Sequence, residues 1–167
     1  MPYLQLDVPA CYSLEVKRGL ARRMGNLYAE IMQTTPDLVD VSIRELQDGV
    51  WHCGYQEPVP GAVLMAEIRR GRPAEQRARL AEALLDACVE ALSLDPTGIA
   101  IEFTQHAGDE IYRKLLVDGT LQGGLGKDWS ATETTTALLE TLKADVRQKK
   151  LAANPNRINH TLERSIP

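Results

Sequence analysis

Near its start the chain reads Tyr3-Leu4-Gln5-Leu6-Asp7-Val8, and a shift of sixty positions lays this stretch over Val63-Leu64-Met65-Ala66-Glu67-Ile68. In both stretches apolar residues alternate with others, which is the pattern of a half-buried β-strand. The same shift later pairs Pro36 with Pro96 without a gap. We therefore interpret the chain as an internal duplication.

Each copy predicts a strand, a helix and a second strand. The first strands are expected over residues 3–8 and 63–69, and the second over 38–46 and 98–104. Between them, apolar residues recur at helical spacing: Val16, Leu20, Met24, Leu27 and Ile31 in one copy, and Leu80, Leu84, Leu85, Val89 and Leu92 in the other. Ser13 is the expected N-cap of the first helix, and Pro73 an early helical residue of the second.

A strand–helix–strand unit of this length has a right-handed crossover and parallel strands. The predicted fold is therefore α/β (α+β): two tandem β-α-β units form a four-stranded sheet with two helices on one face, followed by a C-terminal helix. The other face of the sheet is expected to be partly apolar and to need a cover, which predicts oligomerisation.

The expected organisation is one compact domain with three parts. Residues 2–60 form the first unit with a bridging hairpin or loop over 47–61, and residues 61–126 form the second unit. Residues 127–167 form the C-terminal helix, opened by a capping box at Ser130-Ala131-Thr132-Glu133, and a polar tail. The segment 105–129 reads as irregular and Gly-rich.

Composition narrows the class of protein. The chain has 167 residues, a net charge of −4 and 44% hydrophobic content, which suits a compact domain. The mild acidity argues against nucleic acid or an anionic membrane as partner, and no apolar run approaches the ~20 residues of a membrane span. The odd cysteine count (Cys11, Cys53 and Cys88) without metal spacing predicts a reduced, cytoplasmic protein with no metal and no cofactor.

Pro2 is a candidate general base. Removal of Met1 would leave its nitrogen as a secondary amine at the N-terminus, and an α-amino group titrates near ~8 in model peptides. Burial in an apolar, cationic site disfavours the charged amine and lowers its pKa. A neutral proline nitrogen, held rigidly by its ring, can then accept a proton at pH 7.

Pro2 at the start of a strand, the length of the repeat and the stretch Ile68-Arg69-Arg70-Gly71-Arg72-Pro73-Ala74-Glu75-Gln76 together resemble the tautomerase superfamily. The Gly-Arg-x-x-Glu-Gln segment is similar to the strand-to-helix turn of 4-oxalocrotonate tautomerase (4-OT). The double-length chain with two arginines looks more like the cis-3-chloroacrylic acid dehalogenase group. The resemblance covers residues 2 to about 116. It implies a homotrimer, and an N-terminal proline at the base of a pocket for small enol, 2-oxo or unsaturated carboxylic acids.

The resemblance assigns substrate carboxylate binding to Arg69 and Arg72. Guanidinium groups suit that role independently, because each offers a bidentate fork to a carboxylate. The alternative is a solvated charge cluster that includes Arg70. Tyr28 stands where the dehalogenase group has a catalytic His; it either contacts the substrate or packs at a subunit edge. Glu102 stands at the position of the group's active-site Tyr.

The acidic residue that activates water in the dehalogenase group has no clean counterpart, which leaves Asp109 or Glu110 as candidates. His106 lies either at the rim of the pocket or in an exposed loop. We therefore expect two sets of site residues: Pro2, Tyr28 and Glu102 as catalytic, and Arg69, Arg72, His106 and Glu110 as substrate-binding.

These residues favour a tautomerase, an isomerase that needs only one base, a carboxylate-binding site and a group that returns the proton. Two alternatives remain on the same scaffold. One is a hydratase, dehalogenase or decarboxylase of three-carbon acids. The other is a non-catalytic binding protein.

Overall fold

A computed structural model of the protein describes residues 2–46, 61–110, 112–117 and 120–130, and beyond them only 136–137, 140–141, 143–144 and 148. The chain divides into two compact units, Met1–Ser130 and Ala131–Pro167. In the second unit the described residues are helical, within the range where the sequence predicts a helix. The expected bridging segment from 47 to 60 and the polar tail lie outside the described residues.

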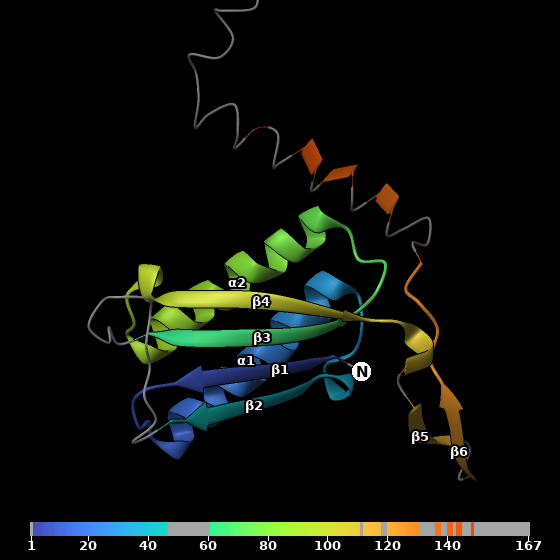
Figure 1. Ribbon diagram of the computed structural model, residues 1–167, viewed down its shortest axis with the longest axis horizontal. Helices are drawn as coiled ribbons and strands as arrows, with labels where there is room; N and C mark the ends of the chain where they lie inside the picture. Colours follow the sequence, from blue (N-terminus) through green and yellow to red (C-terminus); the bar gives the residue numbers. More distant parts are fainter. Residues whose placement is uncertain are drawn as a thin grey trace, which may run out of the picture. The chain divides into compact units, whose positions relative to one another are not determined.

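A four-stranded sheet forms the centre of the first unit (Figure 1). It consists of β1 (Tyr3–Val8), β2 (Asp40–Glu45), β3 (Ala62–Arg69) and β4 (Ile99–His106), in the order β2-β1-β3-β4. β1 runs parallel to β2, β3 runs parallel to β4, and β1 and β3 meet as antiparallel neighbours. This arrangement confirms the two predicted β-α-β units.

Two helices, α1 (Leu14–Met32) and α2 (Ala74–Leu92), cover one face of the sheet (Figure 1). α1 begins as predicted, because the Ser13 hydroxyl accepts a hydrogen bond from the Val16 amide at 3.2 Å. Pro73 lies one position earlier than predicted. It is the N-cap of α2, with an extended backbone (ψ 153°) that precedes the first helical residue.

The core lies between the sheet and the helices. Alternate residues of β1 and β3 point toward α1 and α2 and are almost wholly buried: Leu4, Leu6, Val8, Leu64, Ala66 and Ile68. The helices contribute to this core the apolar residues that the spacing predicts, including Leu20, Met24, Leu80 and Leu84. The duplication therefore supplies two equivalent halves of one apolar layer.

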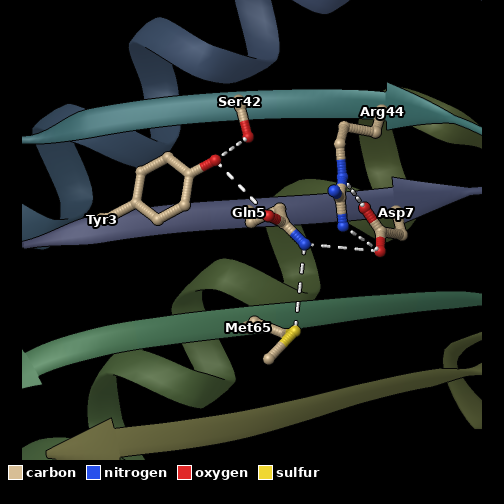
Figure 2. Close-up of polar contacts among 6 residues, drawn as sticks. All are labelled: Tyr3, Gln5, Asp7, Ser42, Arg44 and Met65. Atoms are coloured by element: carbon tan, nitrogen blue, oxygen red, sulfur yellow. Dashed lines mark hydrogen bonds and ion pairs between the residues drawn. The ribbon is translucent and has the colours of Figure 1, made fainter.

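The opposite face of the sheet is mostly polar but also carries the exposed Met65 and the half-buried Val63, so it is partly apolar, as predicted. Figure 2 shows the Tyr3 hydroxyl 2.7 Å from the Ser42 hydroxyl, and Arg44 donating to both carboxylate oxygens of Asp7 at 2.8 and 2.9 Å. Gln5 reaches toward Asp7 and toward the sulfur of Met65 (Figure 2). On β1 and β2 the polar side chains of this face pair with one another, so a partner here would meet polar groups beside the exposed Met65.

The chain beyond β4 is more regular than the sequence predicts. A short 3-10 turn, η3 (Gly108–Glu110), leads into an antiparallel hairpin of β5 (Tyr112–Val117) and β6 (Thr120–Leu125). The sequence does not predict a strand at β6, because β6 contains two consecutive glycines and glycine is depleted in strands. The ring of Tyr112 lies against Gly123. A Cβ atom at this position would collide with the Tyr112 hydroxyl, so this close contact requires glycine.

Candidate active site

Three of the predicted site residues meet at one edge of the sheet. Tyr3 pairs with Glu67 across the antiparallel β1–β3 ladder, so Pro2 lies beside the end of β3, where Arg69 is the last residue. Arg69 in turn pairs with His106, the last residue of β4. Figure 1 shows the start of β1 at the same edge as the ends of β3 and β4.

The connection from β3 to α2 forms a tight turn, residues Arg69 to Arg72, which we call the arginine turn. Gly71 has a φ of +99°, a conformation that L side chains rarely adopt, so only glycine fits here without strain. The Arg70 amide donates to the His106 carbonyl at 2.7 Å, which ties the turn to the end of β4. Arg69 and Arg72 are partly buried, whereas Arg70 is exposed.

Arg72 is held with part of its hydrogen-bonding capacity unused. Its guanidinium carbon lies 4.6 Å from the centre of the Trp129 ring. Its Nε and Nη1 atoms are buried and have no hydrogen-bond partner among the described residues. Burial lowers the pKa of Arg72 to about 10, with Tyr28 raising it and Arg69 lowering it further. The group keeps its positive charge at pH 7, so the turn presents buried, unpaired N–H groups on a cation.

Tyr28, on α1, faces this cation from the core. Its side chain is 2% exposed, so it is buried and does not lie at a surface edge. Burial raises the pKa of Tyr28 to about 12, and the charges of Arg72 and Arg69 act in the opposite direction. Because both arginines influence its phenol, Tyr28 lies within electrostatic reach of the arginine pair. At pH 7 it is a neutral hydroxyl, which donates or accepts a hydrogen bond and does not act as a base.

His106 stands between two carboxylates. Its Nδ1 lies 3.7 Å from Glu110 Oε2, and its Nε2 lies 3.9 Å from Glu67 Oε2. The Nε2 atom is buried and has no hydrogen-bond partner among the described residues. The same Oε2 atom of Glu110 accepts a 2.7 Å hydrogen bond from the Ala107 amide, which helps to hold the carboxylate in place. His106 is therefore a strand residue beside Arg69, and Glu110 is the acidic residue that η3 brings next to it.

Glu102 lies apart from this cluster. It pairs with Met65 in the middle of β4, four positions before the strand ends, and its side chain is exposed. Asp109 is also exposed. The structure therefore puts Arg69, His106 and Glu110 next to one another, with Pro2 beside the end of β3, and leaves Glu102 in mid-strand. Tyr28 and Arg72 form a second group, linked to the first by the charge of Arg69.

Trp129 is the residue that sequence reasoning missed. It follows the glycine-rich hairpin, and no periodicity links it to the arginine turn much earlier in the chain. The one available signal was a large aromatic residue directly after Gly126-Lys127-Asp128 in an otherwise polar stretch.

Two absences concern only the described part of the chain. Within it, no group of three or more His, Cys, Asp or Glu side chains is placed to hold a metal ion. None of its helices is long and apolar enough to cross a bilayer.

The fold is shared with several solved structures. N1, a member of the cis-3-chloroacrylic acid dehalogenase (cis-CaaD) family, superposes with a TM-score of 0.63 and 20% identity over 85% of this chain and 99% of its own. Pt0534, whose structure was solved after inactivation by 2-oxo-3-pentynoate, gives 0.61 and 21% over 65% and 89%. A fused 4-OT solved as a symmetric trimer gives 0.59 and 15% over 64% and 86%.

No protein-family model and no curated protein sequence matches the chain. At these identities the likeness to solved structures establishes the fold. The chain shares its fold with the fused 4-OT and cis-CaaD family structures, as its residues suggest.

Proposed function

We propose that this protein is a tautomerase that converts small enol or 2-oxo carboxylic acids, with Pro2 as general base once Met1 is removed and with Arg69 and Arg72 binding the carboxylate. The observation that carries the proposal is the state of Arg72: a buried cation whose Nε and Nη1 have no partner among the described residues. A carboxylate supplies the acceptor oxygens that such groups need, and charge-assisted bidentate pairs are the strong ones.

Ketonisation of an enol acid needs a base that can also return a proton. The neutral amine of Pro2 takes the enol hydroxyl proton, the C–O bond becomes a carbonyl, and the electrons of the C=C bond form a new C–H bond with the proton that the Pro2 ammonium gives back. Arg69 and Arg72 hold the carboxylate and stabilise the negative charge that develops on the oxygen. Tyr28, neutral at pH 7, offers a hydrogen bond to the same oxygen.

Hydration of an unsaturated acid is a second candidate, favoured by one observation. Water addition, or hydrolytic loss of halide, needs a positioned carboxylate to activate water. Glu110 is held by the Ala107 amide and lies 3.7 Å from His106, next to Arg69 in the register. This pair is suited to orient and deprotonate a water, with His106 carrying the proton.

The proposed assembly is a homotrimer, supported by the fused 4-OT that was solved as a symmetric trimer, and we place the site near the subunit edges. The polar face of the sheet, carrying Tyr3, Gln5 and Arg44, then meets polar groups of neighbouring copies. Such contacts are typical of a specific interface with satisfied hydrogen bonds.

Ultraviolet monitoring of phenylenolpyruvate and 2-hydroxymuconate ketonisation tests the proposal, with chloride release from 3-chloroacrylates followed in parallel. Ketonisation without chloride release supports the tautomerase, and the reverse supports the second candidate. Because Pt0534 was inactivated by 2-oxo-3-pentynoate, the same alkynone should add to the amine of Pro2. Mass spectrometry of the N-terminal peptide would detect the adduct.

A further inference from the structure

The chain crosses back over the arginine turn after β6. We call residues Gly126 to Ser130 the return segment. Its Trp129 amide donates to the Arg70 carbonyl at 3.1 Å, and its Asp128 side chain accepts a 2.7 Å hydrogen bond from the Gly108 amide. One hydrogen bond therefore anchors the segment to the arginine turn, and the other anchors it to the start of η3.

Close backbone contacts fix the path of the return segment further. A Cβ atom at Gly71 would lie 2.5 Å from the Trp129 carbonyl oxygen, and a Cβ atom at Gly108 would collide with the backbone of Lys127. Both positions therefore require glycine for the segment to pass this closely. These contacts fix the backbone of the return segment, and this backbone places the Trp129 indole against the arginine turn.

The Arg72 guanidinium lies over the ring of Trp129. The guanidinium carbon lies 4.6 Å from the ring centre, a distance at which a cation is attracted by the ring electrons. The N–H groups of arginine point outward in the guanidinium plane, so stacking does not consume them. The Nε and Nη1 atoms are buried and have no partner among the described residues, so their hydrogen-bonding capacity is unmet until an acceptor enters that plane.

Stacking also counters the mutual repulsion of the two cations. Burial is the main cause that lowers the pKa of Arg72, and the nearby charge of Arg69 acts in the same direction. The same segment approaches both, since a Cβ atom at Gly126 would lie 3.4 Å from Arg69 Nη2. Without the indole, Arg72 would be free to swing away from Arg69 and toward solvent, and a ligand would have to bear the cost of ordering it again.

We propose that Trp129 is a positioning residue that holds the Arg72 guanidinium by stacking and leaves its N–H edge available to the carboxylate of a small unsaturated or 2-oxo acid. The inference rests on the proposed function for the identity of the ligand. It assigns the return segment a role in substrate affinity that the β-α-β units alone do not provide.

Two substitutions of Trp129 distinguish the effect of its aromatic face from the effect of its size. Trp129→Phe keeps an aromatic face, whereas Trp129→Leu fills space without one. For phenylenolpyruvate we expect Trp129→Leu to raise KM about tenfold with kcat changed less than about threefold, because a partly desolvated cation–π contact is lost from ground state and transition state alike. Trp129→Phe should stay within about threefold of the wild type in both constants. Leu125→Ala, on the exposed part of β6, is the matched control and should change neither.

A measurement that does not depend on turnover keeps the inference separate from the function. In a nitrogen-15 spectrum, the Arg72 Nε–H signal, assigned by its loss in Arg72→Lys, should be shifted upfield by the indole, retained in Trp129→Phe and moved in Trp129→Leu. Titration with fumarate as a stable unsaturated carboxylate should shift this signal, with a Kd about tenfold weaker in Trp129→Leu.

The positioning role would be overturned if Trp129→Leu had the same kcat, KM and fumarate Kd as the wild type and an unmoved Arg72 signal. This would hold even if the protein is an active tautomerase. An inactive wild-type protein that still shows the Arg72 shift and the weaker fumarate binding in Trp129→Leu would overturn the tautomerase proposal and leave the positioning role intact.

Discussion

Arg69 and His106 are direct partners in the parallel β3–β4 ladder, and each is the last residue of its strand. Their side chains therefore leave the same face of the sheet at the same edge. This relationship puts a cation that suits a carboxylate next to an imidazole flanked by Glu67 and Glu110. It also places Arg69 beside Pro2, because β1 starts where β3 ends, with His106 one strand further along the sheet.

Substitution of the arginines tests the carboxylate site. Replacing Arg69 or Arg72 with Ala removes a hydrogen bond to a charged group, typically worth ~1.5–3 kcal/mol. We expect kcat/KM for an enol acid to fall by roughly one to two orders of magnitude, since ~1.4 kcal/mol is tenfold. Arg70→Ala is the control, because this side chain is exposed and only its backbone takes part in the turn. Equal losses in all three variants would indicate a diffuse positive field.

The pH dependence separates Pro2 from Tyr28. If the Pro2 amine is the base, kcat/KM is low at acid pH, where the amine is protonated, and rises as the amine loses its proton. The midpoint should lie below the ordinary α-amino value of ~8. Tyr28 has a pKa of about 12 and stays neutral throughout this range.

Tyr28→Phe should therefore leave the midpoint in place. The loss of one neutral hydrogen bond, ~0.5–1.5 kcal/mol, should lower the rate roughly two- to tenfold. If the pH midpoint of kcat/KM moved or disappeared in Tyr28→Phe, the titrating group would be the phenol and not the amine. That result would contradict the assignment of Pro2 as the base.

The buried amide of Gln76 should matter for stability. Gln76 is fully buried near the start of α2, and its Nε2 donates a 2.7 Å hydrogen bond to the Ile31 carbonyl in the last turn of α1. Gln76→Leu leaves that carbonyl without its partner, which costs ~1–3 kcal/mol of unfolding free energy. Urea denaturation should show the loss, with the exposed Gln105→Leu as a control of near-zero effect. An unchanged midpoint in Gln76→Leu would mean that the helix end is satisfied in another way.

The proposed trimer has a simple physical signature. Light scattering should give about three times the 18.5 kDa chain mass. Met65→Glu, which places a charge among the polar contacts of the open sheet face, should shift the protein toward smaller species. A wild-type protein that stays monomeric at assay concentrations would remove the basis for a site between subunits.

Much of the fold was predictable because its signals are local. Alternation over residues 3–8 matches β1 residue for residue, and Ser13 caps α1 as expected. What lay beyond prediction depends on partners distant in sequence. The β5–β6 hairpin contains Gly123 and Gly124 and carries a weak strand signal, and only its pairing reveals it.

The site residues that belong to a local sequence motif were predictable. Those that tertiary packing brings to the site were not. Arg69 and Arg72 follow from the turn between strand and helix. The burial of Tyr28 depends on how α1 lies on the sheet, and the stacking of Trp129 depends on the return of the chain after the hairpin. Glu102 was selected by alignment of positions, but the register puts it in mid-strand, opposite Met65.

The most direct test of the account compares two proteins that differ only at the amine. In one, Met1 is removed and Pro2 is the N-terminal residue, as intact mass would verify. In the other, a lysine inserted between Met1 and Pro2 keeps the proline nitrogen in an amide bond. With the fold and assembly unchanged, the first should ketonise phenylenolpyruvate and the second should not exceed the uncatalysed rate. Equal rates in the two proteins would show that Pro2 is only a strand residue and would contradict the proposed function.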